Sequence, residues 1–380
     1  MRQRVALVLA TAALAAGCST FDSVNPFASS APKMADLPPI NASVDVRVAW
    51  KESVGKSDNY VFTPAVAGNA VFAAGGKGDV LRIEAGSVRW KVNAGVPLSG
   101  GVGSDGRRVV VGSAKGDVLA FDAADGKELW RAKVSSEVLA APAVDGALVI
   151  VRSGDNRIYA FDAGDGKRKW VYQRQTPPLS LRSFAAPLLD GNYVFAGFPG
   201  GKLMAVTTNN GASAWEGTVA LPKGTTELDR VADITSAPLL AGRLICAVAY
   251  QGRVACFDLN TGNLAWARDM SSAAGLAADN RQLYVTDDKG AVHALDLASG
   301  ASLWKQDKLR LRDLSAPAAL GRLVAVADVK GFVHFLNRED GSFVGRTATD
   351  GTAVTAPLRV FDNKILLQTR GGSVIALEAQ

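Results

Sequence analysis

Three cysteines and two histidines are the residues with which this 380-residue chain could do redox or metal chemistry. Cys246 and Cys256 lie at equal distances from Gln251, which belongs to a Gly-containing turn. On a hairpin the two thiols would face each other, and they would either form a disulfide or remain buried thiols. His293 and His334 occupy the same position in successive copies of a repeat. Because equivalent positions of neighbouring repeats diverge outward, we expect no shared metal site.

Recurring aspartates are the other groups that could act as acids or bases. Four of them each end an alternating apolar segment and precede a Gly-containing turn, where short carboxylates accept backbone hydrogen bonds; they are Asp122, Asp162, Asp258 and Asp296. A residue that recurs in most repeats belongs to the scaffold, so we interpret them as turn caps. No nucleophile elbow, phosphate loop or zinc motif occurs in the sequence. We therefore predict no catalytic residue, no metal ligand and no cofactor.

The repeat that positions these residues is marked by tryptophan. Seven tryptophans recur at intervals of about 40 residues, and six of them follow a short Gly-containing phrase; they are Trp50, Trp90, Trp130, Trp170, Trp215, Trp266 and Trp304. A period of about 40 to 50 residues is that of a four-stranded propeller blade. A large flat indole at one point of every blade suits the gap between neighbouring sheets, where its N–H can reach a backbone carbonyl. We predict a structural docking role for all seven.

The number of repeats predicts an all-β, eight-bladed propeller over residues 45–380. Eight segments open a repeat, six of them with a small residue and proline such as Ala141-Pro142, and eight strands with period-two alternation follow. The segment 46–50 precedes the first opening, and the last repeat, 353–379, lacks an outermost strand. We expect the strand at 46–50 to complete that last blade, because closing the ring removes exposed edges.

The N-terminus is typical of an exported protein. Arg2 and Arg4 precede an apolar run that is too short to span a bilayer, and Cys18 follows small residues. This segment resembles a bacterial lipobox, which implies a signal peptide at 1–17 and acylation of Cys18. Ser19 then implies transfer to the outer membrane. The alternative is an ordinary cleaved signal with an incidental cysteine. Residues 18–44, rich in Ser, Ala, Pro and Asn, are expected to form a flexible tether.

The charge of the chain gives no indication of a nucleic-acid partner. The formal net charge is +6, and it falls to +4 (6 − 2) when Arg2 and Arg4 leave with the signal. Charges of both signs are interspersed along the chain, without a long basic run.

The phrase from Ala120 and Asp122 through Gly126 to Trp130 resembles the tryptophan-docking repeat of PQQ-dependent dehydrogenases. The resemblance implies the propeller fold over most of residues 46–380, and a periplasmic dehydrogenase that uses PQQ and calcium is the alternative function. Such enzymes typically carry vicinal cysteines and a calcium site, and no two cysteines are adjacent here. A propeller that binds polysaccharide or peptidoglycan is a third alternative.

A lipobox followed by eight such repeats is similar to the BamB family, the lipoproteins of the outer-membrane β-barrel assembly (BAM) complex. The resemblance implies a non-catalytic scaffold that binds the POTRA domains of BamA and, through BamA, the other BAM subunits. It also implies assistance to the folding and insertion of outer-membrane β-barrel proteins, and nascent barrel proteins are possible further partners. In that family two interblade loops bind BamA. The corresponding residues here are Leu179, Leu181, Arg182, Asp229, Arg230 and Asp233.

The residue types in these two segments fit that role independently of the resemblance. Apolar anchors beside an arginine are common at the centres of protein interfaces, and Arg182 can pair with a carboxylate through two hydrogen bonds. The alternative is that the leucines pack on the propeller itself and that Arg182 pairs with Asp229 or Asp233.

Overall fold

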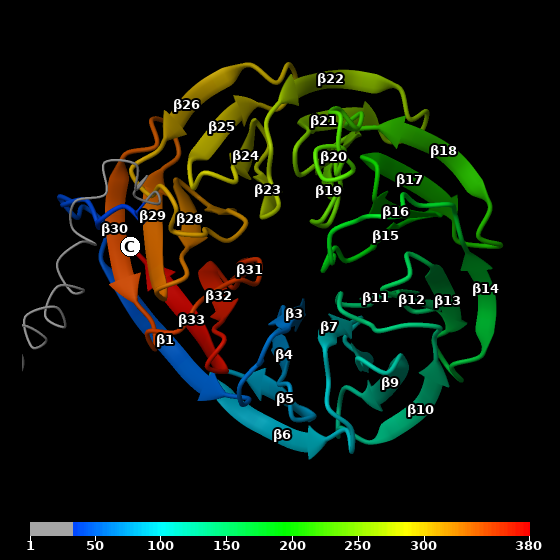
Figure 1. Cartoon of the computed structure of the whole chain (residues 1–380). Coiled ribbons are helices and arrows are strands. Elements are labelled where there is room, and N and C mark those ends of the chain that lie inside the picture. The colour runs from blue at the N-terminus through cyan, green and yellow to red at the C-terminus, as the bar shows by residue number, and fades with distance from the viewer. Residues whose placement is uncertain (1–32) are drawn as a thin grey trace, which may run out of the picture. The chain divides into compact units, whose positions relative to one another are not determined.

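The computed structural model describes residues 33–380, and residues 35–380 form one compact unit. That unit is a closed ring of eight antiparallel sheets (Figure 1), and it confirms the predicted eight-bladed propeller. The described part contains strands and turns but no helix, so no helix in it could cross a membrane. Short strands surround the centre of the ring and longer strands form its circumference.

The first four blades follow one another along the chain. The first contains β3 (Ala65–Ala67), β4 (Ala70–Ala74), β5 (Asp79–Glu84) and β6 (Ser87–Asn93). The second contains β7 (Gly100–Ser104), β8 (Arg108–Gly112), β9 (Asp117–Asp122) and β10 (Glu128–Lys133), and the third contains β11 (Ala143–Val144), β12 (Leu148–Arg152), β13 (Ile158–Asp162) and β14 (Arg168–Tyr172). The fourth contains β15 (Leu188–Asp190), β16 (Tyr193–Phe198), β17 (Lys202–Thr207) and β18 (Ser213–Thr218).

The last four blades complete the ring. The fifth contains β19 (Leu239–Ala241), β20 (Leu244–Val248), β21 (Arg253–Asp258) and β22 (Leu264–Asp269). The sixth contains β23 (Gly275–Ala278), β24 (Gln282–Thr286), β25 (Val292–Asp296) and β26 (Ser302–Gln306), and the seventh contains β27 (Ala318–Leu320), β28 (Leu323–Ala327), β29 (Phe332–Asn337) and β30 (Phe343–Ala348). The eighth contains β31 (Arg359–Phe361), β32 (Lys364–Gln368), β33 (Ser373–Ala379) and β1 (Val46–Ser53).

The eighth blade is completed by the N-terminal strand, as the count of repeats predicts. β1 runs antiparallel to β33, with Val46 opposite Ala379 and Ser53 opposite Ser373. Beyond the paired strands, the amide of Gln380 donates to the carbonyl of Asp45 and the amide of Asp45 donates to the carbonyl of Gln380. Both ends of the propeller therefore share one sheet, and β33 is not left as an open edge.

The tryptophans join each blade to the next one along the chain. In most blades the residue opposite the tryptophan in the same sheet is small, for example Ala120 opposite Trp130. The indole lies over the turn glycine of the following blade, where a Cβ on Gly166 would come within 2.6 Å of Trp130 Cε3. Six indole N–H groups donate to a backbone carbonyl of that blade over 2.7–3.2 Å; they belong to Trp90, Trp130, Trp170, Trp215, Trp266 and Trp304. Trp50 also packs on a turn glycine, Gly86, but through Cβ, Cγ and Cδ1, and its N–H has no acceptor among the described residues.

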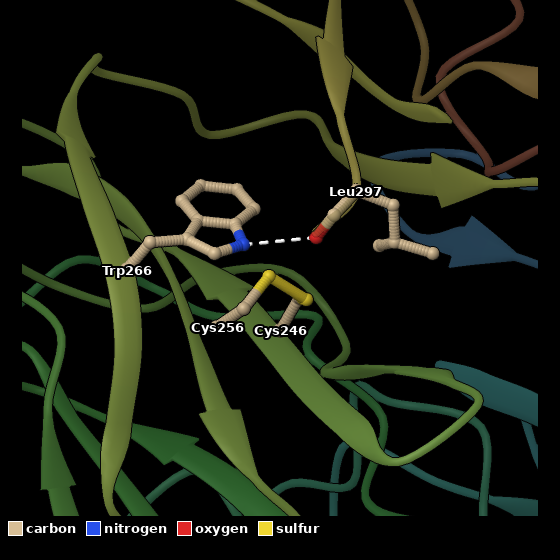
Figure 2. The surroundings of a disulfide bond; sticks show 4 residues. All are labelled: Cys246, Cys256, Trp266 and Leu297. Atoms are coloured by element: carbon tan, nitrogen blue, oxygen red, sulfur yellow. Dashed lines mark hydrogen bonds between the residues drawn. A yellow bond between two sulfur atoms is a disulfide. The ribbon is translucent and has the colours of Figure 1, made fainter. Parts of the chain in front are cut away.

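Cys256 occupies the small-residue position opposite one of these tryptophans, and Cys246 lies beside it on the neighbouring strand. They face each other on β20 and β21, and a disulfide joins them (Figure 2). Cys256 also lies opposite Trp266, whose N–H donates to the Leu297 carbonyl at 2.9 Å. The sequence left open whether the two cysteines form a disulfide or remain buried thiols, and the structure has the disulfide.

One blade differs from the expected four strands. A two-residue strand, β2 (Val61–Phe62), runs parallel to β7 and makes that sheet five-stranded. Here Gly100 and Gly101 replace the usual small residue and proline. Because glycine has no side chain and retains its N–H, another backbone can approach closely at this point. The amide of Thr63 donates to the Gly101 carbonyl at 3.0 Å and extends the contact.

The expected flexible tether over residues 18–44 is wrong for its last part, because residues 35–44 lie along the seventh blade. Arg312 donates to the Ala35 carbonyl at 2.9 Å and Arg346 donates to the Pro38 carbonyl at 3.0 Å. The amides of Ser43 and Val44 donate to the carbonyl of Val344 on β30. We call residues 35–44 the N-terminal strap. Residues 18–32, with Cys18, lie outside the described part, as does the predicted signal at 1–17.

A buried ionic cluster holds the two arginines that bind the strap. Arg312 donates to Asp328 at 2.6 Å, and Asp328 also contacts Nε2 of His334 at 3.1 Å. Arg346 donates through Nε to Nδ1 of His334 at 3.1 Å. Since Nδ1 accepts this bond, the neutral histidine carries its proton on Nε2 and donates it to Asp328. Burial lowers the pKa of His334, and hydrogen bonds from His334 and neighbouring groups outweigh burial and lower the pKa of Asp328 to about 2.

Candidate partner-binding site

Two long connections between blades carry the residues singled out in the sequence. The first loop, residues 173–187, joins β14 to β15, and the second loop, residues 219–238, joins β18 to β19. Both are connections from an outermost strand to the innermost strand of the next blade, so they emerge on the same face. Residues of both loops, among them Leu181, Phe184 and Thr235, line one cavity. The structure thus brings the two predicted segments together.

The first loop presents its leucines to solvent. Leu179 is 44% exposed and Leu181 is 37% exposed, so neither side chain is packed into the core of the propeller. The backbone of Leu181 is fixed, because its amide donates to Oδ2 of Asp233 in the second loop at 2.7 Å. Exposed apolar side chains on a backbone that is held in place lose little conformational freedom when a partner covers them.

Arg182 pairs with neither Asp229 nor Asp233, the partners considered in the alternative reading of the sequence. It makes two hydrogen bonds to Glu137, from Nε at 3.2 Å and from Nη2 at 2.7 Å. Its guanidinium also lies over the rings of Tyr60 and Phe184, at 5.6 and 5.8 Å from their centres. The bonds to Glu137 raise the pKa of Arg182. The side chain remains about half exposed, so the N–H groups that Glu137 does not use are available to a partner carboxylate.

The second loop presents both charge and apolar surface. Asp229 and Arg230 are exposed. Asp229 closes a local turn, because its carboxylate accepts from the amide of Thr226 at 3.2 Å, and the hydrogen bonds from Thr226 lower its pKa. Leu221 and Leu228 are 60% and 69% exposed, and neither was singled out from the sequence. An apolar residue inside the polar run 223–230 was the available signal for Leu228.

Asp233 differs from the expectation that it contacts the partner. It is only 2% exposed, and its two carboxylate oxygens accept from the amides of Leu181 and Gly200 at 2.7 and 3.0 Å. Arg152 lies buried near it, and desolvation lowers the pKa of Arg152 to about 10 although the charge of Asp233 opposes that shift. A buried carboxylate that accepts these hydrogen bonds is not accessible to a partner. Asp233 therefore acts by holding the backbone of the first loop in position.

The arrangement offers apolar anchors, a half-exposed arginine and exposed charges on two joined loops, which are the components of a protein-binding surface. In the described part of the chain, no group of three or more His, Cys, Asp or Glu side chains could hold a metal ion. His293 pairs with Asp287 at 2.9 Å and His334 with Asp328, each within its own blade. The recurring Asp122 accepts from the amide of Ala124 at 2.7 Å, as expected of a turn cap.

The fold defines a tryptophan-docked β-propeller, and the two loops form its candidate protein-binding face. A family model described as "Outer membrane protein assembly factor BamB" matches residues 76–306. The chain is 43% identical to the outer membrane protein assembly factor BamB of Bordetella pertussis over 379 residues, covering 99% of this chain and 97% of the relative. It is 35% identical to the protein of the same name from Escherichia coli K12, covering 97% of each. The chain belongs to the BamB family.

Solved structures agree with that assignment. The crystal structure of BamB from Moraxella catarrhalis superposes with a TM-score of 0.82 at 30% identity, covering 88% of this chain and all of that one. A quinohemoprotein alcohol dehydrogenase from Comamonas testosteroni superposes with a TM-score of 0.69 at 14% identity, covering 88% of this chain and 76% of the dehydrogenase. At that identity the likeness to the dehydrogenase concerns the fold alone.

Proposed function

We propose that this chain is a non-catalytic subunit of the BAM complex that binds the POTRA domains of BamA and assists the insertion of β-barrel proteins into the outer membrane. The observation that carries the proposal is the exposed Leu179 and Leu181 beside the half-exposed Arg182, on a loop held in place by Asp233, in a member of the BamB family. The propeller acts as a rigid body that grips the periplasmic arm of its partner.

The proposal places the propeller on the periplasmic side of the outer membrane, anchored by acyl chains on Cys18. The motif around Cys18 supports the anchor. Several acyl chains hold firmly, since each buried CH₂ contributes about 0.8 kcal/mol. In the Cys18→Ser chain we expect no incorporation of labelled palmitate and loss of the protein from the outer-membrane fraction. Unchanged labelling would show that the anchor is elsewhere.

The test of partner binding is capture of BamA from detergent-solubilised outer membranes on the tagged full-length chain. Leu181→Ala and Arg182→Ala should each weaken capture, because truncating a central anchor typically costs about 2 kcal/mol, or about thirtyfold in affinity. Matched controls are Leu303→Ala on β26, where Leu303 is 49% exposed, and Arg243→Ala, whose side chain is 86% exposed. Full retention of BamA by both loop variants would contradict the proposal.

A further inference from the structure

The propeller encloses an axial cavity that the partner-binding loops do not account for. A cavity of about 500 Å³ is lined by residues from most blades, including Val61, Ala141, Ala273 and Pro357. A second cavity of about 350 Å³ shares Ala141 and Ala186 with it, and it also shares Arg359. Figure 1 shows β31, which begins with Arg359, at the inner side of its blade. The two cavities therefore succeed each other along the axis of the ring, with Arg359 bordering both.

The innermost strands, which form the wall of the axis, are almost free of charge. The eight innermost strands of residues 33–380 contain only two charged residues, Asp190 and Arg359, and Asp190 lines neither cavity. The segments that open the repeats add alanines and prolines such as Ala186 and Pro357. Among the described residues, Arg359 is the one charged side chain that the innermost strands contribute to either cavity. Connections at the rim of the larger cavity add further charged side chains, which are Arg182, Arg370, Asp287, Asp288 and Asp313.

The Arg359 guanidinium has no counter-charge in the described part of the chain. It makes no hydrogen bond and no ion pair there, whereas Arg253, for example, donates to the Val219 carbonyl at 2.9 Å and Arg312 to Asp328. Arg359 is exposed to the solvent of the cavity, and no carboxylate lies near enough to raise its pKa against the desolvation that lowers it. Its side chain therefore adds nothing evident to stability.

Three carboxylates line the same cavity, those of Asp287, Asp288 and Asp313, and none of them pairs with Arg359. Asp287 pairs with His293 at 2.9 Å, and Asp288 accepts from the amide of Ala273 at 2.8 Å. Neither carboxylate is available to neutralise Arg359. A guanidinium without a partner gains most from a planar anion that accepts two of its N–H bonds, and a carboxylate has that geometry.

We propose that Arg359 makes the axial cavity a binding site for a carboxylate group, carried either by a small organic acid or by an acidic side chain of an extended peptide. The volume lies within the range of sites for small ligands, and the wall combines apolar surface with a few charged groups, as such sites commonly do. Access is from the face that carries the two loops, because Leu181 and Thr235 line the same cavity. Arg359 itself belongs to neither loop, although Leu181 and Arg182 line the mouth of the cavity.

The experiment is calorimetric titration of the full-length chain in detergent with two probes. One probe is citrate, and the other is a blocked pentapeptide of alanines with a central glutamate, compared with the same peptide carrying glutamine. We expect at least one carboxylate probe to bind the unaltered chain and Arg359→Gln to bind it about ten- to a hundredfold more weakly, as expected for a lost hydrogen bond to a charged group. Arg359→Lys should recover part of the affinity, because it restores the charge without the bidentate geometry.

The control is Arg243→Gln, which removes an exposed arginine outside both cavities and should leave binding unchanged. Binding of citrate alone identifies a free acid as the ligand, binding of the glutamate peptide alone identifies a peptide, and binding of both supports the shared carboxylate chemistry. Arg359→Gln should melt like the unaltered chain and still capture BamA, so this proposal and the proposed function can fail separately. Failure of both probes to bind, or equal affinity of Arg359→Gln, would overturn the inference.

Discussion

The contact between Trp130 and Gly166 gives a test of how neighbouring blades are held together. Gly166 has φ of +71°, and a Cβ added there would lie 2.6 Å from Cε3 and 2.7 Å from Cδ2 of Trp130. Gly166→Ala therefore combines two costs. An alanine in the left-handed region costs about 1–2 kcal/mol, and forcing a well-packed ring to move costs about 1–3 kcal/mol more. The expected loss in the free energy of unfolding is about 2–5 kcal/mol.

The two costs can be separated in a double-mutant cycle. Trp130→Ala alone should lower the free energy of unfolding by about 3–5 kcal/mol, because the indole is 8% exposed and its N–H donates to the Ala163 carbonyl at 3.0 Å. In the Trp130→Ala background the indole is absent, so Gly166→Ala retains only the backbone cost of about 1–2 kcal/mol. The double variant should accordingly lose about 1–3 kcal/mol less than the sum of the losses of the two single variants.

The assay is urea unfolding followed by far-ultraviolet circular dichroism, since indole fluorescence changes with the substitution itself. The control is Gly146→Ala, at a glycine without positive φ and with nothing within 4 Å of an added Cβ. We expect that control to stay within about 0.5 kcal/mol of the unaltered chain. Equal penalties for Gly166→Ala with and without the indole would refute the argument that the ring and the turn glycine form the contact between blades.

Three further predictions concern closure, the loops and pH. Deletion of β1 should lower the melting temperature of the whole propeller because it exposes the edge of β33; a melting curve unchanged from that of the full chain would contradict the role of closure. Asp233→Ala should increase proteolytic cleavage within residues 178–183 and weaken capture of BamA, since the amides of Leu181 and Gly200 lose their acceptor, and intact protection would show that the loop is held otherwise. His334 has a lowered pKa in the folded state, so the unfolded chain binds the extra proton first and stability should fall as the pH drops below about 6.5, the ordinary value. Asp328, with a pKa of about 2, adds a further loss below about pH 4, and His334→Gln should flatten only the upper part of the curve measured by urea unfolding at each pH.

The repeat could be predicted from the sequence because the same residue pattern recurs in each copy. Trp130 and its equivalents recur with a turn glycine at fixed spacing, and the surplus strand at 46–50 has one vacant place to pair. The extra strand β2 could not be predicted in this way. It depends on a close approach of two backbones at Gly100 and Gly101, which leaves no periodic pattern in the sequence.

The candidate site was predicted in outline but not in its contacts. The lengthened connections and the leucines of the first loop could be recognised, whereas the partner of Arg182 lies 45 residues earlier, at Glu137, with no local signal. Aspartate is usually found at the surface, so the sequence gives no sign that Asp233 is buried. The structure shows it buried and bonded to the amide of Leu181. The strap was mistaken for tether because its polar, proline-containing sequence resembles a linker, and the arginines that bind it are about 300 residues away.

The pairing of β1 with β33 also has a consequence for the order in which the polypeptide matures. Ser53 and the residue opposite it in the sheet, Ser373, are 320 positions apart (373 − 53). β1 is made first, and it can pair with β33 only after almost the entire chain has been made. Contacts of such long range form late and slowly. During export, the amino-terminal strand is thus an unsatisfied edge for as long as translocation lasts, and chaperones that shield such edges should matter most in that interval.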